Sequence, residues 1–128
     1  MKRPRVLIVD DSSVMRKIME RSLRQAGLDI GHVVEAGNGI EALAAVREEP
    51  FDLILSDINM PAMDGLEFLR QLNKMDDAKG TPVVMVTTEG SETRVAEALS
   101  IGAKGYIRKP FTADQIKECV SPLLEVLR

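Results

Sequence analysis

The sequence of 128 residues is poor in the residue types that form disulfides, zinc sites and membrane anchors. Its single cysteine, Cys119, cannot close an internal disulfide, which is typical of a reducing compartment. Its single histidine, His32, leaves no pair of imidazoles for zinc. No apolar run approaches the roughly 18 residues that cross a membrane, and the basic start MKRPR precedes an apolar run too short for a signal peptide. We expect a cytoplasmic protein without a membrane partner.

An excess of basic charge is also missing. The chain has 17 basic and 20 acidic residues and a net charge of -3, which gives no general attraction to nucleic acid. Hydrophobic residues make up 45% and charged residues 29%, as in ordinary globular proteins. This length suits one domain with a real core. We therefore expect a single domain over residues 1–128, without an output domain, that is monomeric and does not bind nucleic acid.

Short apolar runs alternate with longer stretches of helical periodicity along the chain. Val, Ile and Leu dominate three of the runs, as expected for inner strands that are covered on both faces. The five expected strands are residues 5–9, 32–36, 51–55, 82–86 and 105–108. This alternation predicts an α/β fold with a mainly parallel sheet.

Five expected helices follow the strands, and most begin at a capping residue. The start signals are Ser12 or Ser13, Asn38, Asp64 with Glu67, Ser91, and Thr112 with Gln115. The expected apolar stripes are Val14, Met15, Ile18, Met19, Leu23 and Ala26 in the first helix, Ile40, Leu43, Ala44 and Val46 in the second, and Leu66, Leu69 and Leu72 in the third. They are Val95, Ala98 and Leu99 in the fourth, and Ile116, Cys119, Val120, Leu123, Leu124 and Leu127 in the last. Pro122 lies inside the last helix and predicts a kink or loosened last turns.

Charged and hydroxyl side chains gather where the expected strands end. They are Asp10 and Asp11 after the first strand, Asp57 after the third, Thr87 and Thr88 at the fourth, and Lys109 after the fifth. Ligands of open parallel sheets bind outside the carboxyl ends of the strands, where loops and helix N-termini meet. These residues therefore predict one site at one edge of the sheet.

Three acids at one site repel each other, so we expect a cation among them. A pair of like charges 4 Å apart costs about 1 kcal/mol in water and roughly 4 kcal/mol at an effective dielectric near 20. Lys109 offsets one charge, and the rest suits a hard divalent ion with oxygen ligands, which Mg²⁺ fits best. With that ion, one carboxylate can attack phosphorus while a lysine and a hydroxyl stabilise the transferred oxygens. The set predicts phosphoryl transfer to an aspartate.

Each residue taken alone also has an ordinary interpretation. Asp10 and Asp11 can simply cap the first helix, and Lys109 can be a solvated surface lysine. Tyr106 is more often a half-buried strand aromatic than a switch. Cys119 on an apolar stripe indicates core packing, and we assign His32 no role.

Four motifs, taken together and in order, resemble the receiver domain of two-component response regulators. They are LIVDDSS, LILSDINMPAMDG, MVTTEG and GYIRKPF, and the resemblance covers nearly the whole chain. It is strongest to the stand-alone chemotaxis members, the CheY-like receivers. The resemblance implies a flavodoxin/CheY-like, doubly wound five-stranded parallel sheet of order 2-1-3-4-5 with five helices.

The resemblance also implies a role for each site residue. Asp57 would be the phosphoacceptor, and Mg²⁺, with Mn²⁺ able to substitute, would bind Asp10, Asp11, Asp57 and the backbone carbonyl of Asn59. Thr87 would hydrogen-bond the phosphoryl group and Lys109 would pair with it.

Further roles concern switching and hydrolysis. Lys109–Pro110 would be a cis peptide, and Tyr106 would turn inward as Thr87 moves. Asn59 and Glu89 resemble positions that tune hydrolysis of the acyl phosphate.

By this resemblance the protein is a response regulator that takes its phosphoryl group from a histidine kinase of the CheA type. It would not be an enzyme beyond self-phosphorylation from small donors and self-dephosphorylation. Its fourth helix, fifth strand and fifth helix would bind a flagellar switch component or another effector. The sequence departs from chemotaxis members there, because Glu92 and Cys119 stand where basic residues are usual.

Two alternative functions stay open at this point. The chain could be the input domain of a larger regulator. It could also be a metal-dependent phosphohydrolase with an aspartate nucleophile, although Ser12 and Asn59 stand where such enzymes place the second acid of an Asp-x-Asp motif.

Overall fold

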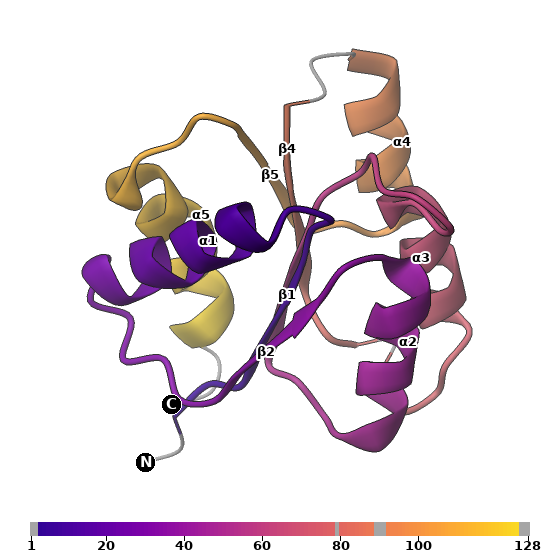
Figure 1. The fold of residues 1–128 in the computed structure, drawn as a ribbon, viewed down its shortest axis with the longest axis horizontal. Coiled ribbons are helices and arrows are strands. Elements are labelled where there is room, and N and C mark those ends of the chain that lie inside the picture. Colours follow the sequence, from indigo (N-terminus) through magenta and orange to yellow (C-terminus); the bar gives the residue numbers. More distant parts are fainter. Residues whose placement is uncertain (1–2, 79, 89–91, 126–128) are drawn as a thin grey trace.

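In the computed structural model, five parallel strands form one sheet, and helices cover both of its faces (Figure 1). The structure describes residues 3–78, 80–88 and 92–125. The strands are β1 (Val6–Val9), β2 (Val33–Ala36), β3 (Leu53–Ser56), β4 (Val83–Thr87) and β5 (Gly105–Arg108). The helices are α1 (Ser13–Gln25), α2 (Gly39–Glu48), α3 (Gly65–Asn73), α4 (Glu92–Ile101) and α5 (Ala113–Glu125). The strand order β2-β1-β3-β4-β5 confirms the predicted doubly wound α/β fold.

The strand register brings the predicted site residues to one edge of the sheet. Val9, the last residue of β1, pairs with Ala36 at the end of β2 and with Ser56 at the end of β3. Thr87 ends β4 beside Arg108, the last residue of β5. The residues that follow these strands therefore emerge side by side.

Two apolar clusters sandwich the sheet, because alternate residues of each strand point to opposite faces. Leu7 and Val9 of β1 belong to the cluster under α2, α3 and α4, whereas Val6 and Ile8 belong to the cluster under α1 and α5. The second cluster also includes Met19, Leu23, Ile116 and Val120. Both faces of the sheet are therefore buried, which explains why the inner strands consist of continuous apolar residues.

The apolar stripe predicted for the first helix is wider than the buried face of α1. The helix begins after the N-cap Ser12, as predicted, and it buries Met19 and Leu23. Val14 and Ile18, however, are 68% and 40% exposed. They lie on the side of α1 that the sheet and α5 do not cover.

The stripes predicted for α2 and α4 need similar corrections. In α2, Leu43 is buried with Ala42, while Ile40 and Ala44 are exposed. In α4, Ala98 is buried, but Leu99 is 47% exposed. These short helices pack along a narrow line on the sheet, so an apolar residue slightly off that line stays in contact with solvent.

The last helix continues through Pro122 to Glu125, so the proline does not end it. Pro122 is exposed, while Ile116, Val120 and Leu124 are buried against the sheet. A bend at Pro122 stays a prediction, and Leu127 lies outside the described residues. Among the described helices, none is long and apolar enough to span a membrane.

Candidate functional site

Asp10 follows β1 directly, and its backbone fixes its position. The Asp10 N–H donates to the carbonyl of Ala36 at the end of β2, at 3.0 Å. Its Oδ1 accepts a hydrogen bond from the Ser12 N–H at 2.9 Å, at the start of α1. Asp10 is 1% exposed, whereas its neighbour Asp11 is exposed. One acid is therefore built into the edge of the sheet and the next faces solvent.

Asp57 is held in the same way after β3. Its N–H donates to the carbonyl of Val9 at 2.9 Å, and its Oδ1 accepts from the N–H of Ile58 at 2.7 Å. The residue is 7% exposed. These two hydrogen bonds fix the backbone and the carboxylate of Asp57 at the end of β3.

Lys109 directly follows β5 and forms ion pairs with both buried acids, Asp10 and Asp57. Its Nζ lies 2.5 Å from Asp10 Oδ2 and 3.1 Å from Asp57 Oδ2. Burial alone would lower the pKa of Lys109, but the hydrogen bond to Asp10 and the charge of Asp57 outweigh burial and raise this pKa above its ordinary value. Lys109 therefore carries a full positive charge between the carboxylates.

The backbone around Lys109 adopts the geometry that the sequence resemblance implied. The peptide bond between Lys109 and Pro110 is cis. The Lys109 N–H donates to the carbonyl of Thr87 at 2.9 Å, which ties the end of β5 to the end of β4.

The loop after Asp57 returns close to its backbone. The Gly65 N–H donates to the carbonyl of Ile58 at 2.7 Å. A Cβ on Gly65 would lie 2.1 Å from the carbonyl oxygen of Asp57, so only glycine fits here. Asp64, the predicted cap of the third helix, accepts from the N–H of Glu67 at 2.9 Å. The start of α3 therefore packs directly against the backbone of Asp57.

The three acids fit a hard divalent cation. One carboxylate oxygen from each of Asp10, Asp11 and Asp57 lies within 4.8 Å of the other two. Mg²⁺ takes oxygen ligands, usually binds one or two carboxylates directly and keeps several waters, so three acids of which one is exposed can hold it directly or through water. Asn59 is exposed two residues after Asp57, and its role as a carbonyl ligand stays a prediction.

The remaining predicted residues surround this cluster at different depths. Thr87 is fully buried at the end of β4. Tyr106 is half-buried on β5, in register with Met85, and packs against the core cluster of α2, α3 and α4. Glu89 lies outside the described residues. The structure thus brings together Asp10, Asp11, Asp57 and Lys109, as predicted, while the roles of Thr87 and Tyr106 stay predictions.

Sequence reasoning missed Arg16 and Glu35. The Arg16 guanidinium donates to the carbonyl of Asp10 at 2.7 Å and to Glu35 Oε1 at 2.8 Å. A possible signal was an arginine one turn into the helix that follows two acids, combined with an acid in a mostly apolar second strand.

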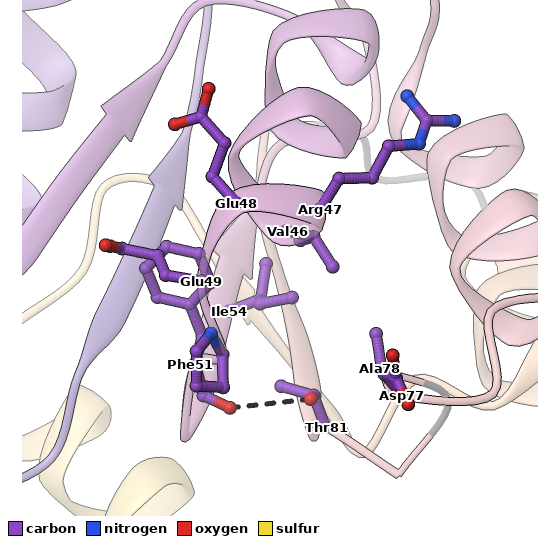
Figure 2. A pocket seen from close by; sticks show the side chains of 10 residues that line it. Val46, Arg47, Glu48, Glu49, Phe51, Ile54, Asp77, Ala78 and Thr81 are labelled. Atoms are coloured by element: carbon purple, nitrogen blue, oxygen red, sulfur yellow. Dashed lines mark hydrogen bonds between the residues drawn. The ribbon is translucent and has the colours of Figure 1, made fainter.

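A pocket lies at the opposite end of the sheet from the acid cluster. Figure 2 shows this pocket of about 290 Å³, which lies where residues 50–51 and 81 lead into β3 and β4. Its walls include Val46, Phe51 and Ile54, and Thr81 donates to the carbonyl of Phe51 at 3.4 Å. None of the predicted site residues lines this pocket, so we do not assign the functional site to it.

The two residues to which no catalytic role was assigned also lie away from the acids. His32 is exposed, with Nε2 3.7 Å from Glu49 Oε1. Cys119 on α5 is half-buried, and burial raises the pKa of its thiol. The partial burial of Cys119 agrees with the packing role predicted for it.

Comparisons with known proteins agree with this geometry. Residues 6–121 match the family described as the response regulator receiver domain. The chain is 38% identical to chemotaxis protein CheY-3 of Vibrio cholerae over 98% of this chain and 95% of that protein. It is 39% identical to chemotaxis protein CheY of Pseudomonas aeruginosa over 94% of this chain and 96% of that protein. A solved structure of CheY4 of Vibrio cholerae superimposes with a TM-score of 0.85 at 36% identity, covering 96% of this chain and 100% of that one.

Proposed function

Because the chain belongs to the response regulator receiver domain family, we propose that Asp57 accepts a phosphoryl group from a histidine kinase. The chain is homologous to chemotaxis response regulators, which act in two-component signalling. The observation that carries the proposal is the placement of a single lysine between two buried carboxylates with a third acid nearby. The likeness to these chemotaxis relatives supports a receiver domain that extends over residues 1–128 and a cytoplasmic location.

Asp10, Asp11 and Asp57 would hold Mg²⁺, or Mn²⁺ in its place, and the carbonyl of Asn59 would be a further ligand. When bound, the ion supplies positive charge to the phosphoryl oxygens. The acid cluster supports this assignment because its carboxylate oxygens converge without a nitrogen or sulfur ligand.

The residues of the chain divide the remaining work. The Ile58 N–H holds Asp57 Oδ1, which leaves Oδ2 to attack phosphorus. The new O–P bond forms as the N–P bond of the donor phosphohistidine breaks, and the histidine nitrogen leaves with the electron pair. Lys109, already beside Oδ2, balances the added negative charge.

Thr87 and Tyr106 would convert this local change into a signal. Thr87 ends the buried strand β4 next to the site, and its hydroxyl would bind the phosphoryl group. Tyr106 is half-buried on the adjacent strand, where it could turn as Thr87 moves. Hydrolysis would be tuned by Asn59 and Glu89, of which Asn59 is exposed next to the acids.

The effector face would consist of α4, β5 and α5. A groove of about 320 Å³ lies there between α4 and β5. It is lined by Glu92, Val95, Ala96, Leu99, Tyr106 and Arg108. We propose that an effector binds this face, with a flagellar switch component as one candidate and a CheA-type kinase as phosphodonor. Glu92 gives the groove an acidic end, which favours a partner with a basic residue at that point.

The charge of Glu92 offers a test of the effector face. Glu92→Lys reverses the charge at the end of the groove, while Glu41→Lys on α2 makes the same change away from it. Affinity for each candidate effector should change with the first variant and stay constant with the second. An unchanged affinity of every candidate for Glu92→Lys contradicts the assignment of this face.

Phosphorylation itself is tested by intact mass after incubation with acetyl phosphate, with and without Mg²⁺. The wild-type protein should gain one phosphoryl group that depends on Mg²⁺, and Asp57→Asn should gain none. A persistent adduct on Asp57→Asn contradicts the assignment of Asp57. If the wild type shows no adduct, beryllofluoride binding separates rapid hydrolysis from a site that does not react.

Two further measurements, turnover of small phosphoesters and the mass of the native protein, distinguish the alternative functions. A metal-dependent phosphohydrolase would turn over small phosphoesters many times, whereas a receiver retains one phosphoryl group until it hydrolyses. The receiver is favoured because Asn59, not an acid, follows Asp57 at the second position. Mass spectrometry of the native protein would reveal a larger regulator of which this chain is the input domain.

A further inference from the structure

Arg16 connects the acid cluster to β2. It lies in the first turns of α1, and its side chain is only 19% exposed. Its NH1 donates to the carbonyl of Asp10 at 2.7 Å, and its Nε donates to Glu35 Oε1 at 2.8 Å. One guanidinium therefore holds the loop after β1 and a side chain of the neighbouring strand at the same time.

The carbonyl that Arg16 binds belongs to the peptide that links the two predicted metal ligands. Asp10 and Asp11 share this peptide plane, so its orientation decides where the Asp11 side chain leaves the backbone. The Asp10 carboxylate is fixed separately, by the Ser12 N–H and by Lys109. The contact from Arg16 therefore bears on Asp11, the one exposed acid of the cluster.

Glu35 completes the arrangement. A free guanidinium near a cation site would repel the cation, but here the Glu35 carboxylate on its other side offsets part of that charge. Glu35 also accepts from Lys17 Nζ at 2.5 Å. The hydrogen bond from Lys17 and that from Arg16 outweigh burial and lower the pKa of Glu35, so Glu35 is charged at neutral pH.

We propose that Arg16 is a positioning residue for the divalent cation, and that Glu35 orients it. Arg16 fixes the Asp10–Asp11 peptide so that the Asp11 carboxylate meets those of Asp10 and Asp57. The proposal rests on the proposed function, because it assumes that the acid cluster binds Mg²⁺.

An ordinary surface ion pair gives a different expectation. Such a pair stabilises the fold slightly and leaves metal affinity unchanged. A residue that orients a metal ligand changes metal affinity by about 10-fold to 100-fold when it is removed. Metal affinity therefore separates the two roles, whereas thermal stability alone does not.

The experiment measures binding of Mg²⁺ alone by calorimetry and of Mn²⁺ by electron paramagnetic resonance, without a phosphodonor. Arg16→Met should weaken both affinities about 10-fold. The matched control is Lys17→Met, which also removes a cation from Glu35 but does not contact Asp10. It should change the affinities by less than about 2-fold.

Two further variants test how Arg16 acts. Arg16→Lys keeps the charge but has no fork to reach Asp10 and Glu35 together, so it should lose nearly as much affinity as Arg16→Met. Glu35→Gln should weaken binding in the wild-type background and have no additional effect in Arg16→Met. Full affinity in Arg16→Lys would show that charge suffices and would overturn the positioning role.

The outcomes also separate this inference from the proposed function. If the wild type binds Mg²⁺ and folded Arg16→Met binds it equally well, the inference fails and the proposed function stands. If the wild type binds neither ion, both fail. If Lys17→Met weakens binding as much as Arg16→Met, the effect does not come from the contact between Arg16 and Asp10, and the inference fails.

Discussion

The acid cluster and the α4–β5–α5 face adjoin each other on the same sheet, but different contacts hold them. Around Asp57 the contacts are made by backbone groups and buried charges, such as the Ile58 N–H and Lys109. On the proposed effector face they are made by half-exposed side chains, including Leu99, which is 47% exposed. The difference teaches that chemistry on phosphorus needs a fixed frame, whereas a binding face can vary its side chains without disturbing that frame.

Gly65 and Gly105 illustrate the difference between backbone contacts near Asp57 and side-chain contacts on the other face. A Cβ on Gly65 would lie 2.1 Å from the carbonyl oxygen of Asp57, which belongs to the backbone. A Cβ on Gly105 would lie 2.6 Å from the Sγ of Cys119, which belongs to a side chain. The first clash can be relieved only if the main chain under Asp57 moves. The second can be relieved by one substitution on α5.

The largest expected effect comes from Gly65→Ala. The added methyl group forces the backbone of Asp57 away from α3, so we expect the free energy of unfolding to fall by about 4 kcal/mol. Urea denaturation measures this change. Gly80→Ala is the matched control, because its Cβ would meet nothing within 4 Å, and it should leave stability unchanged within about 0.5 kcal/mol. Equal stability of the two variants would remove the contrast.

Lys109→Met tests the buried charges of the same region. Without Mg²⁺, it leaves Asp10 and Asp57 without their cation, and we expect a loss of about 3 kcal/mol. Mg²⁺ should bind more tightly than to the wild type, because a positive charge has left the site. Calorimetry with and without Mg²⁺ checks both effects.

The exposed Lys104 supplies the control for that variant, since Lys104→Met removes the same charge elsewhere. It should leave both stability and Mg²⁺ affinity unchanged. Weaker Mg²⁺ binding by Lys109→Met would contradict the view that Lys109 and the metal compete for the same negative charge.

The sequence predicted the frame of the site because strand ends can be located by local rules. Apolar runs stop where Asp10, Asp57 and Lys109 begin, and parallel strands bring their carboxyl ends to one edge. The fold and the acid cluster were therefore accessible from composition and spacing. The strand order, the cis Lys109–Pro110 peptide and the individual roles entered only through the resemblance of four motifs to one family.

Contacts between elements that are distant in sequence could not be predicted. Arg16 and Glu35 meet because α1 packs beside β2, and neither residue belongs to the four motifs that carry the resemblance. For the same reason Val14, Ile18 and Ile40 were expected to be buried but are exposed. Periodicity indicates which residues share a helix face, but the neighbouring elements decide how much of that face is covered.

The packing of β5 against α5, within the proposed effector face, is tested by Gly105→Ala combined with Cys119→Ala. Gly105→Ala alone should lower stability by about 1–2 kcal/mol, because the new methyl group presses on the Cys119 sulfur. Cys119→Ala removes that sulfur, so the double variant should regain most of the loss. Thermal unfolding of the four proteins gives the coupling energy. Additive losses would mean that β5 and α5 are as rigid as the frame beneath Asp57.

The smallest expected effect is that of acid pH on the loop after β1, compared with its effect on β5. The hydrogen bond from Lys17, with that from Arg16, holds the pKa of Glu35 below its ordinary value of 4.5. The stability from Glu35 is therefore fully present above pH 4.5 and is lost as pH falls through its lower folded-state pKa. Because exposed pairs are screened by solvent, global stability should change little. The protection of amides against hydrogen exchange, corrected for the intrinsic exchange rate at each pH, should fall on acidification more in the loop after β1 than in β5. Glu35→Gln should show low protection in this loop at neutral pH and little further change with acid. An equal fall of protection in β5 of the wild type would mean that both regions depend on the same titrating groups, and that charge does not distinguish the frame from the proposed binding face.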